Sequence, residues 1–376
     1  MDRFGTLFMI SDYGGTHDPC MGGTITGCPA GVEIDLVFIQ SELDRRAPSQ
    51  HPYSTQRREA DRVEFLSGIE NSVTTGAPIQ FRIPNEDVQS DLAMLHVLKP
   101  SHASFTYKRK YGITDNSGTG RASARQTVCR VVGGAIAKLF LKKFGIEISA
   151  REERTKEEHF LLLSEEKVAD GGLPPDDGRG ETAEKVADGG LPPDDGRGET
   201  VEAEPQPNGG DTFGALVHCV IKNLPAGLGE PVYNKFDARL AYAMLSINAC
   251  KGFEIGKGFA AANMKGSEYN DIQNPDFSFQ SNNDGGVQAG ITNGQDLYFS
   301  VAFKPIPTLQ MEQKTIDFEG NPITYTGNSR NDRCVAPRVL PVVEAMAALV
   351  TADFMLYPNL QNVAFLNWLC ALETRH

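Results

Sequence analysis

A glycine-rich stretch near the start of the chain carries the first residues that could do chemistry. It reads YGGTHDPCMGG, from Tyr13 to Gly23, with His17, Asp18 and Cys20 at its centre. Glycines let a backbone bend or approach a ligand closely, and a histidine can exchange protons near neutral pH. Taken alone, the stretch fits a phosphate cradle, a metal site, a catalytic loop or a plain turn.

Basic side chains in loops that contain glycine, proline or serine form a second pattern. Guanidinium and ammonium groups in such loops suit carboxylates and phosphates. Together with His17 and His102, these cations indicate a small, highly anionic substrate and a proton transfer. The cations are Arg45, Arg46, Lys99, Arg121, Arg125, Arg130, Lys304, Arg330 and Arg338.

Three generic motifs are too incomplete to carry a function. Residues 118–123 read GTGRAS, a lone partial match to a dinucleotide fingerprint without a clear strand before it. Residues 252–258 resemble a phosphate-binding loop, but their spacing is one residue short and the final serine or threonine is missing. His17, Asp18 and Cys20 have no apparent fourth ligand at the usual spacing, so we expect no metal.

Length and composition favour a soluble globular protein of one or two domains. The 376 residues are 40% hydrophobic, and no apolar run approaches the roughly 18 residues of a membrane span. The N-terminus lacks a secretory pattern. The 7 cysteines are scattered without a CxxC pair, which predicts a reducing compartment and a cytoplasmic location.

An internal repeat marks an acidic, low-complexity insertion. EKVADGGLPPDDGRGET spans residues 166–182 and recurs unchanged at 184–200. The formal net charge of the chain is −13, and the 13 acidic and 4 basic residues of 165–204 supply most of it, which opposes binding to nucleic acid or anionic lipid. We interpret 152–210 as a disordered insertion, either a duplicated linker without function or a regulatory or partner-binding segment.

The flanking segments predict the helices and strands that must position these residues. Apolar residues at helical spacing predict a helix in 122–144, with a capping pair at Ser123 and Gln126. Residues 235–247 and 341–356 are also predicted to be helical, and 31–46 to run from a strand or loop into a helix. Residues 76–87 and the segment from residue 214 have strand character, and alternation predicts a strand in 296–308. Without strict βαβ alternation, this order favours α+β layers.

Long stretches on both sides of the insertion resemble the chorismate synthase family, in family order. The most specific is the pattern G-x-x-S-A-R-x-T with its following valine and Gly-Ala in residues 120–136. The other similar stretches are residues 28–46, 57–87, 99–113, 223–259, 285–308 and 333–350. On these residues the chain is identified as a member of that family.

The resemblance implies a lyase of the shikimate pathway, which leads to the aromatic amino acids. The family makes chorismate from 5-enolpyruvylshikimate 3-phosphate by 1,4-anti elimination of phosphate, and it needs reduced FMN without net redox change. Some members reduce FMN themselves with NADPH, whereas others use an external reductant. The implied fold is a single-domain β-α-β sandwich of residues 1–376 around the insertion, assembled as a homotetramer, with no nucleic acid or membrane partner.

The resemblance also implies roles for individual residues. His17 is implied as the general acid near the substrate phosphate, His102 as the residue that protonates the reduced flavin, and Asp332 as the partner of the flavin in deprotonation. The residues implied to bind substrate are Arg46, Lys99, Arg125 and Arg330. Those implied to contact FMN are Arg121, Ala122, Ser123, Asn248, Ala249, Ala289, Lys304, Pro305, Ile306, Pro307, Thr308 and Arg330.

Several positions depart from the family pattern. The family loop G-E-S-H-G reads G-G-T-H-D here, so one carboxylate is lost at Gly15 and another is gained at Asp18. These departures motivate a second interpretation, a weak or inactive member that acts as a flavin-binding or structural protein. The remaining departures are Met9, Ala47 and Pro52 in place of arginines, Lys99 in place of an arginine, Ala289 in place of a glycine, and Asn331 and Arg333 in RNDRC.

Overall fold

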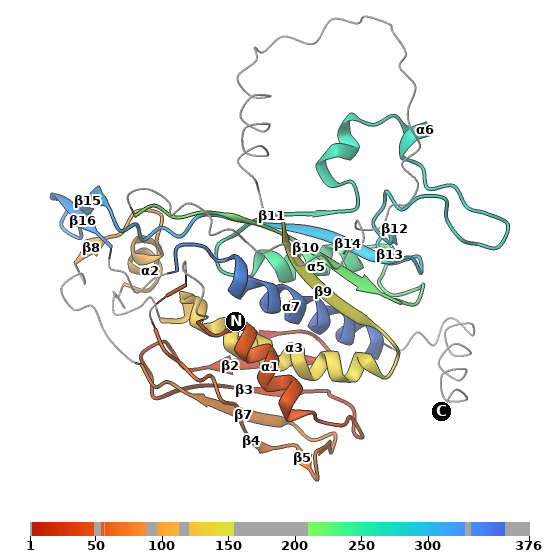
Figure 1. Cartoon of the computed structure of the whole chain (residues 1–376), viewed down its shortest axis with the longest axis horizontal. Helices are drawn as coiled ribbons and strands as arrows, with labels where there is room; N and C mark the ends of the chain where they lie inside the picture. Colours follow the sequence, from red (N-terminus) through yellow and green to blue (C-terminus); the bar gives the residue numbers. More distant parts are fainter. Residues whose placement is uncertain are drawn as a thin grey trace, which may run out of the picture.

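Two antiparallel sheets enclose a layer of helices in the computed structural model of this chain (Figure 1). The central helices are α1 (Leu36–Arg46), α3 (Thr127–Lys142) and α7 (Ala336–Leu356). Antiparallel sheets combined with helices confirm the α+β class that the sequence predicts. The structure describes residues 2–48, 54–55, 57–87, 96–112, 120–153, 210–327 and 332–357.

The first sheet is built from strands whose side chains alternate between the core and solvent. In β7, which reads IQFRIP, Ile79, Phe81 and Ile83 are buried while Gln80 and Arg82 are exposed. A period of two gives the sheet one apolar face, which packs on α3. Its antiparallel order is β1 (Arg3–Phe4), β2 (Met9–Tyr13), β3 (Cys20–Thr26), β7 (Ile79–Pro84) and β4 (Glu64–Ser67).

The second sheet follows the same rule on the other side of the helices. Leu297, Phe299, Val301 and Phe303 of its strand β14 are buried at alternate positions, and α7 packs on its strands β9 and β10. This pattern confirms the strand predicted in residues 296–308. The antiparallel order is β11 (Cys250–Ile255), β14 (Leu297–Phe303), β10 (Ala215–Lys222) and β9 (Glu147–Glu153).

Strand β9 corrects the predicted start of the insertion. Glu152 and Glu153 pair with Val217 and Leu216 of β10, so the first two residues of the predicted segment 152–210 belong to the sheet because the hydrogen-bond ladder continues through them. At the other end, the carbonyl of Gly210 accepts a hydrogen bond from the N–H of Gln310 at 2.9 Å. Residues 154–209, including both repeats, lie outside the described residues.

Helices α3 and α7 approach each other closely because α3 presents glycines at the contact. A Cβ atom added to Gly134 would lie 2.2 Å from the Cβ of Ala345 on α7. One added to Gly133 would lie 2.7 Å from Cδ1 of Ile10 in β2. These spaces hold a hydrogen atom but not a methyl group, so the two glycines fix the spacing of the central layer.

Helix α7 is longer and more apolar than the sequence analysis allowed. Among the described residues, it is the one helix that is long and apolar enough to cross a membrane. Its most apolar 18-residue stretch has a mean hydropathy of 1.8, and 89% of that stretch is buried inside the protein. The expectation that no apolar run approaches 18 residues is therefore wrong for α7. Its surroundings explain the composition, because α1, α3, α5 and the second sheet all pack against it.

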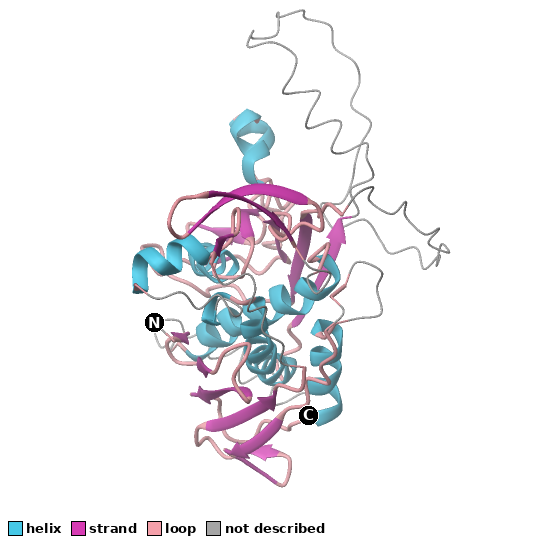
Figure 2. Ribbon diagram, turned by 90° about the vertical axis from the view of Figure 1, so that its left-hand side faces the viewer, coloured by secondary structure: helices cyan, strands magenta, loops and turns pink. Residues whose placement is uncertain are grey.

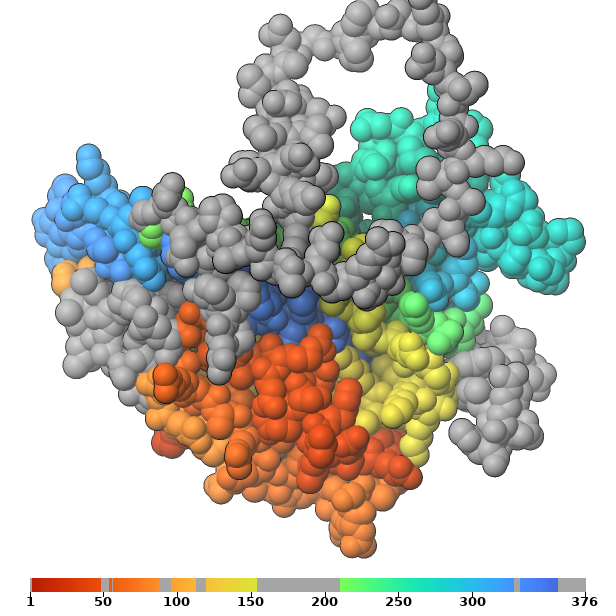
Figure 3. Space-filling model, viewed as in Figure 1, coloured from red at the N-terminus to blue at the C-terminus, as the bar shows by residue number. Residues whose placement is uncertain are grey.

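Smaller elements extend from this layered body. Strands β16, β15 and β8 form a sheet next to α2 at one end of the molecule, and the β12–β13 hairpin lies at the other end (Figure 1). Figure 2 shows strands on both sides of the helices, and Figure 3 shows the β15–β16 hairpin projecting from the body. Their bounds are β8 (Val97–Leu98), β15 (Glu312–Asp317), β16 (Pro322–Thr326), β12 (Val287–Gln288), β13 (Ile291–Thr292), β5 (Ile69–Glu70), β6 (Val73–Thr74), α2 (Ser104–Tyr111), α5 (Phe236–Leu245) and α6 (Gly266–Tyr269).

Candidate active site

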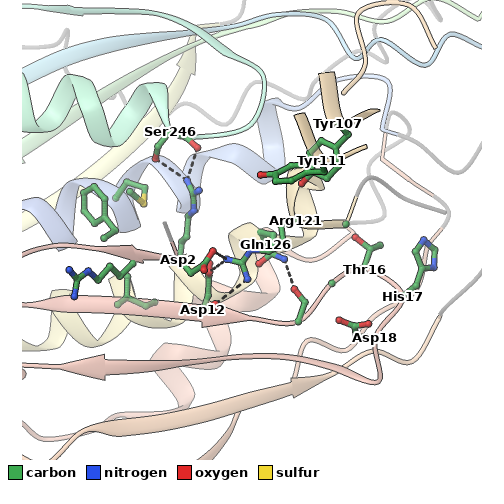
Figure 4. A pocket seen from close by; sticks show the side chains of 18 of the residues that line it. Asp2, Asp12, Thr16, His17, Asp18, Tyr107, Tyr111, Arg121, Gln126 and Ser246 are labelled. Carbon is green, nitrogen blue, oxygen red and sulfur yellow. Dashed lines mark hydrogen bonds and ion pairs between the residues drawn. The ribbon is translucent and has the colours of Figure 1, made fainter. Parts of the chain in front are cut away.

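A cavity of about 800 Å³ lies between the loop that carries His17 and the beginning of α3 (Figure 4). Tyr107 and Tyr111 of α2 form one wall, with their ring centroids 5.1 Å apart. Arg121 and Arg130 also line the cavity. The cavity therefore combines a histidine, an aromatic wall and guanidinium groups, as a site for an anionic and partly planar ligand requires.

The loop of His17 joins β2 to β3 and is held by hydrogen bonds to its carbonyls. Gly14 has φ +87°, which a glycine adopts without strain, and its carbonyl accepts a hydrogen bond from Nε2 of Gln126 at 2.6 Å. Asn85 Nδ2 donates to the carbonyls of Gly15 at 3.1 Å and Asp18 at 2.7 Å. The loop is thus positioned by residues distant in the sequence, and Nε2 of His17 is shielded from solvent.

The capping pattern predicted at the start of α3 is half right. Oγ of Ser123 accepts a hydrogen bond from the N–H of Arg125 at 3.2 Å, as an N-cap does. Gln126 does not reach back to Ser123: its Nε2 donates to the carbonyl of Gly14, and the N–H of Ser123 donates to the carbonyl of Gly120 at 3.3 Å instead. Two short 3₁₀ turns, Gly120–Ala122 and Ala124–Gln126, therefore precede α3, which begins at Thr127 rather than at the cap.

The carboxylate of Asp18 occupies the space next to Gly15. A Cβ atom added to Gly15 would lie 3.3 Å from Oδ2 of Asp18, and both residues line the cavity. The two departures from the family loop are therefore neighbours in space, because the carboxylate gained at Asp18 lies within contact distance of where a side chain at position 15 would begin. The exchange keeps a negative charge beside His17 (Figure 4).

Buried arginines near this loop form the arginine-side network, which consists of Asp332, Arg338, Arg46, Asp61, Arg125 and Asn85. Nη1 of Arg338 donates to Oδ2 of Asp332 at 2.6 Å, and its Nε donates to the carbonyl of Arg46 at 3.0 Å. Asp61, whose side chain is fully buried, accepts hydrogen bonds from Nη1 of Arg46 and Nη1 of Arg125. Arg125 continues to Asn85, with Nε 3.0 Å from Oδ1.

Arg46 is more enclosed than a ligand-contacting residue needs to be. Its side chain is 3% exposed, and it also donates to Thr127 at 3.1 Å and to the carbonyl of Ala124 at 3.0 Å. Burial and the positive charge of Arg338 lower the pKa of Arg46 to about 9, against the opposing charge of Asp61. The group therefore remains charged at neutral pH.

A second set of contacts forms the lysine-side network, which consists of Ser101, Lys304, Ala249, Asn248 and Ala122. Nζ of Lys304 donates to the carbonyl of Ser101 at 2.9 Å, and its backbone N–H donates to the carbonyl of Ala249 at 3.0 Å. Nδ2 of Asn248 donates to the carbonyl of Ala122 at 2.7 Å. Three of the segments predicted to contact FMN are joined in this way. The two networks meet at residues 120–126.

His102 lies directly beside the lysine-side network. Burial, together with the positive charges of Lys99 and Lys304, lowers its pKa to about 4. Its Nδ1 atom is buried and has no hydrogen-bond partner among the residues that the structure describes. A buried polar atom of this kind next to two cations indicates a place for an anionic group that can also hydrogen-bond.

These observations show that the residues present fit FMN. Lys304 and the amide groups of the 3₁₀ turns suit a phosphate, the tyrosine wall suits a planar ring system, and Nδ1 of His102 offers a hydrogen bond to it. Lys99 lies 5.8 Å from the ring centroid of Tyr325 and supplies further positive charge. Pro305–Thr308 follow Lys304, and the carbonyl of Ile306 accepts a hydrogen bond from Thr212 at 2.7 Å.

Ala289, which is predicted to contact FMN, belongs to neither network and does not line the cavity. Ala289 lies in the β12–β13 hairpin with φ 54°, next to Gly290, whose carbonyl accepts a hydrogen bond from the N–H of Phe236 at the start of α5. Arg330 lies outside the described residues. Conversely, sequence reasoning missed Asp61, Asn85, Gln126, Tyr107 and Tyr111. Two features of the sequence could have indicated them. Asp61, Asn85 and Gln126 are acidic or amide residues near arginines in the sequence, and Tyr107 and Tyr111 are spaced four residues apart in a short helix.

The antiparallel α+β fold and this site define an enzyme of the anion-binding, acid–base class. A family model described as chorismate synthase matches residues 8–356. The chain is 46% identical over 362 residues to "Chorismate synthase" of Christiangramia forsetii, covering 94% of this chain and 97% of that protein. It is 44% identical over 369 residues to "Chorismate synthase" of Parabacteroides distasonis, covering 95% and 98%. The chain belongs to the chorismate synthase family.

A solved structure agrees with this assignment. It is described as "Crystal Structure of Chorismate Synthase", and the superposition has a TM-score of 0.63 at 25% sequence identity. The matched region covers 94% of this chain and 92% of that chain. The likeness therefore extends across both sheets and the helices between them.

Proposed function

We propose that this chain is an active chorismate synthase, a lyase that eliminates phosphate from 5-enolpyruvylshikimate 3-phosphate to give chorismate with reduced FMN. The observation that carries the proposal is the meeting of the arginine-side and lysine-side networks at residues 120–126 beside the cavity. This arrangement supports a site that takes two anionic molecules next to each other. The carboxylate lost at position 15 is replaced by the nearby carboxylate of Asp18, which favours an active enzyme over an inactive family member.

Substrate binding is assigned to the cations of the arginine-side network and their neighbours. Nη2 of Arg125 is buried without a hydrogen-bond partner among the described residues, with Glu59 at 3.8 Å, which leaves donors available for a carboxylate or phosphate. Arg46 contributes by holding Asp61, which in turn orients Arg125. Lys99 and Arg330 complete the proposed substrate-binding set.

Proton handling is assigned to three residues. His17, in the cavity wall, gives a proton to the departing phosphate, which lowers the cost of forming that anion. Asp332 takes up the proton lost from the substrate, and its Oδ1 also accepts a hydrogen bond from the N–H of Thr55 at 2.8 Å. His102 holds a proton next to the flavin, because an anionic group bound there would favour its charged form.

The lysine-side network and the segments joined to it would hold FMN. When bound, reduced FMN supplies the electronic step of the elimination, and the protein supplies position and proton balance. The proposed contact residues are those named from the sequence. They are Arg121, Ala122, Ser123, Asn248, Ala249, Ala289, Lys304, Pro305, Ile306, Pro307, Thr308 and Arg330. Turnover with NADPH as the sole reductant would test whether this chain reduces FMN itself.

The proposal extends to the organisation of the whole protein. We infer one β-α-β sandwich domain interrupted by the low-complexity insertion, supported by a core cluster that, among the described residues, includes members of both sheets and of the central helices. We further propose a homotetramer located in the cytoplasm. Light scattering of the purified protein tests the assembly.

One anaerobic assay tests the activity. Purified protein is given 5-enolpyruvylshikimate 3-phosphate and chemically reduced FMN, and chorismate is measured. We expect turnover, and we expect His17→Ala, His102→Ala and Asp332→Ala each to lower kcat by about 100-fold or more while the far-UV circular dichroism is kept. FMN binding without turnover in the wild-type protein would instead support a flavin-binding relative without activity.

A further inference from the structure

Asn85 directly follows β7 and contacts two parts of the site that are far apart in the sequence. Its Nδ2 atom lies 3.1 Å from the carbonyl oxygen of Gly15 and 2.7 Å from that of Asp18, on the two sides of His17. Its Oδ1 atom lies 3.0 Å from Nε of Arg125. One amide group therefore joins the histidine loop to an arginine proposed to bind substrate.

The chemistry of the amide leaves one orientation. The Nδ2 group has two hydrogens and faces two carbonyl oxygens, while Oδ1 accepts from a guanidinium that can only donate. The reverse orientation would place an acceptor against two acceptors and a donor against a donor. Asparagine therefore uses both amide hydrogens and its oxygen here, which an aspartate, serine or alanine at the same position cannot do.

The surrounding backbone ties Asn85 to the same turn. Its own N–H donates to the carbonyl of Pro19 at 3.0 Å, and the N–H of Asp18 donates to the carbonyl of Gly15 at 3.2 Å. The turn that carries His17 is therefore closed on itself and fastened to the end of β7. A shift of the Arg125 guanidinium on anion binding would reach both ends of this turn through one side chain.

We propose that Asn85 is a positioning residue that couples the anion-binding Arg125 to the proton-donating His17. The inference rests on the proposed function, because the roles of Arg125 and His17 come from it. Asn85 acts through these two residues rather than on the substrate. It keeps His17 in register with the anion held by Arg125, so that proton transfer and phosphate departure occur at the same place.

The variant Asn85→Asp separates this role from packing. The substitution keeps the size of the side chain and a partner for Arg125, but it places an acceptor against the carbonyls of Gly15 and Asp18. We expect kcat to fall by about 10- to 100-fold and amide hydrogen exchange of residues 14–18 to become faster. FMN affinity, measured by quenching of flavin fluorescence, should stay within about twofold because Asn85 contacts no member of the lysine-side network.

Asn223→Asp is the matched control. Asn223 also donates from Nδ2 to a loop carbonyl, that of Gly145 at 2.8 Å, and its side chain is exposed. We expect this variant to keep wild-type kcat and wild-type exchange in residues 14–18. Asn85→Ala, which removes all three contacts without adding a charge, is the second test variant if Asn85→Asp does not fold.

The outcomes are separable. Unchanged kcat and unchanged loop exchange in both Asn85 variants would overturn the inference, and so would a parallel loss of FMN affinity, which would indicate general unfolding. A wild-type protein that makes no chorismate would refute the proposed function, whereas the exchange comparison would still confirm or refute that Asn85 holds the loop.

Discussion

His102 shows at the scale of one residue how burial and neighbouring cations prepare a site for an anion. Its pKa of about 4, against an ordinary value of 6.5, arises from burial and from Lys99 and Lys304. Because the unfolded chain binds this proton at a higher pH than the folded chain does, the free energy of unfolding should fall as the pH drops from about 6.5 toward 4. The expected loss between about pH 7 and pH 5 is at most about 2 kcal/mol.

Urea denaturation of the ligand-free protein at the two pH values measures this loss. His102→Gln removes the titrating group, so the variant should lose clearly less stability over this interval than the wild-type protein. Equal losses in the two proteins would show that the low pKa of His102 is not real. Adding FMN should reduce the wild-type loss, because an anionic ligand offsets the two lysines.

Gly134 carries the prediction at the scale of the element. A methyl group at this position would overlap Ala345 on α7, with a Cβ–Cβ separation of 2.2 Å and a Cβ–Cα separation of 2.3 Å. Since the overlap is with backbone rather than with a flexible side chain, the helices must move apart. We expect Gly134→Ala to lower the free energy of unfolding by about 3 kcal/mol or more, measured by chemical denaturation.

Gly266→Ala is the comparison for that substitution. Gly266 lies in α6, and an added Cβ atom would meet nothing within 4 Å. Alanine has the higher helix propensity, so this variant should be neutral or slightly stabilising. If Gly134→Ala were as mild as Gly266→Ala, the close approach of α3 and α7 would be incorrect.

Glu344 carries the prediction at the scale of the whole molecule, because it joins the helical layer to the second sheet. Its carboxylate accepts hydrogen bonds from Arg45 of α1 at 2.8 Å, Lys138 of α3 at 2.6 Å and the N–H of Ala150 in β9 at 2.9 Å. Burial alone would raise its pKa, but the hydrogen bond from Arg45 and the charge of Lys138 outweigh burial and lower it.

A lowered carboxyl pKa contributes stability that is present above the unfolded value of 4.5 and lost as the pH falls through the folded value. Glu344→Gln should therefore destabilise the protein at neutral pH by about 3 kcal/mol, because Arg45 and Lys138 lose their charged partner. The difference between the two proteins should shrink below about pH 4. A constant difference across this range, measured by denaturant midpoints, would contradict the assignment.

Much of the architecture follows from local sequence patterns. Strand character in 76–87 and alternation in 296–308 predicted β7 and β14, and helical character predicted α1, α3, α5 and α7, since each pattern needs only neighbours within a few residues. The segments around Arg46, Arg125, Asn248 and Lys304 also identified the family from sequence alone. These features depend on residue type and short spacing, both of which can be read directly.

Tertiary structure alone decided how the site is held together. The contact of Asn85 with Gly15 spans 70 residues, that of Gln126 with Gly14 spans 112, and that of Arg338 with Arg46 spans 292. No periodicity links such positions, because loop side chains select partners only after the sheets and helices have packed. The sequence by itself therefore determined the α+β elements and the residues suited to the chemistry. The fold decided that Gln126 serves Gly14 rather than a helix cap, and that the carboxylate of Asp18 lies beside Gly15.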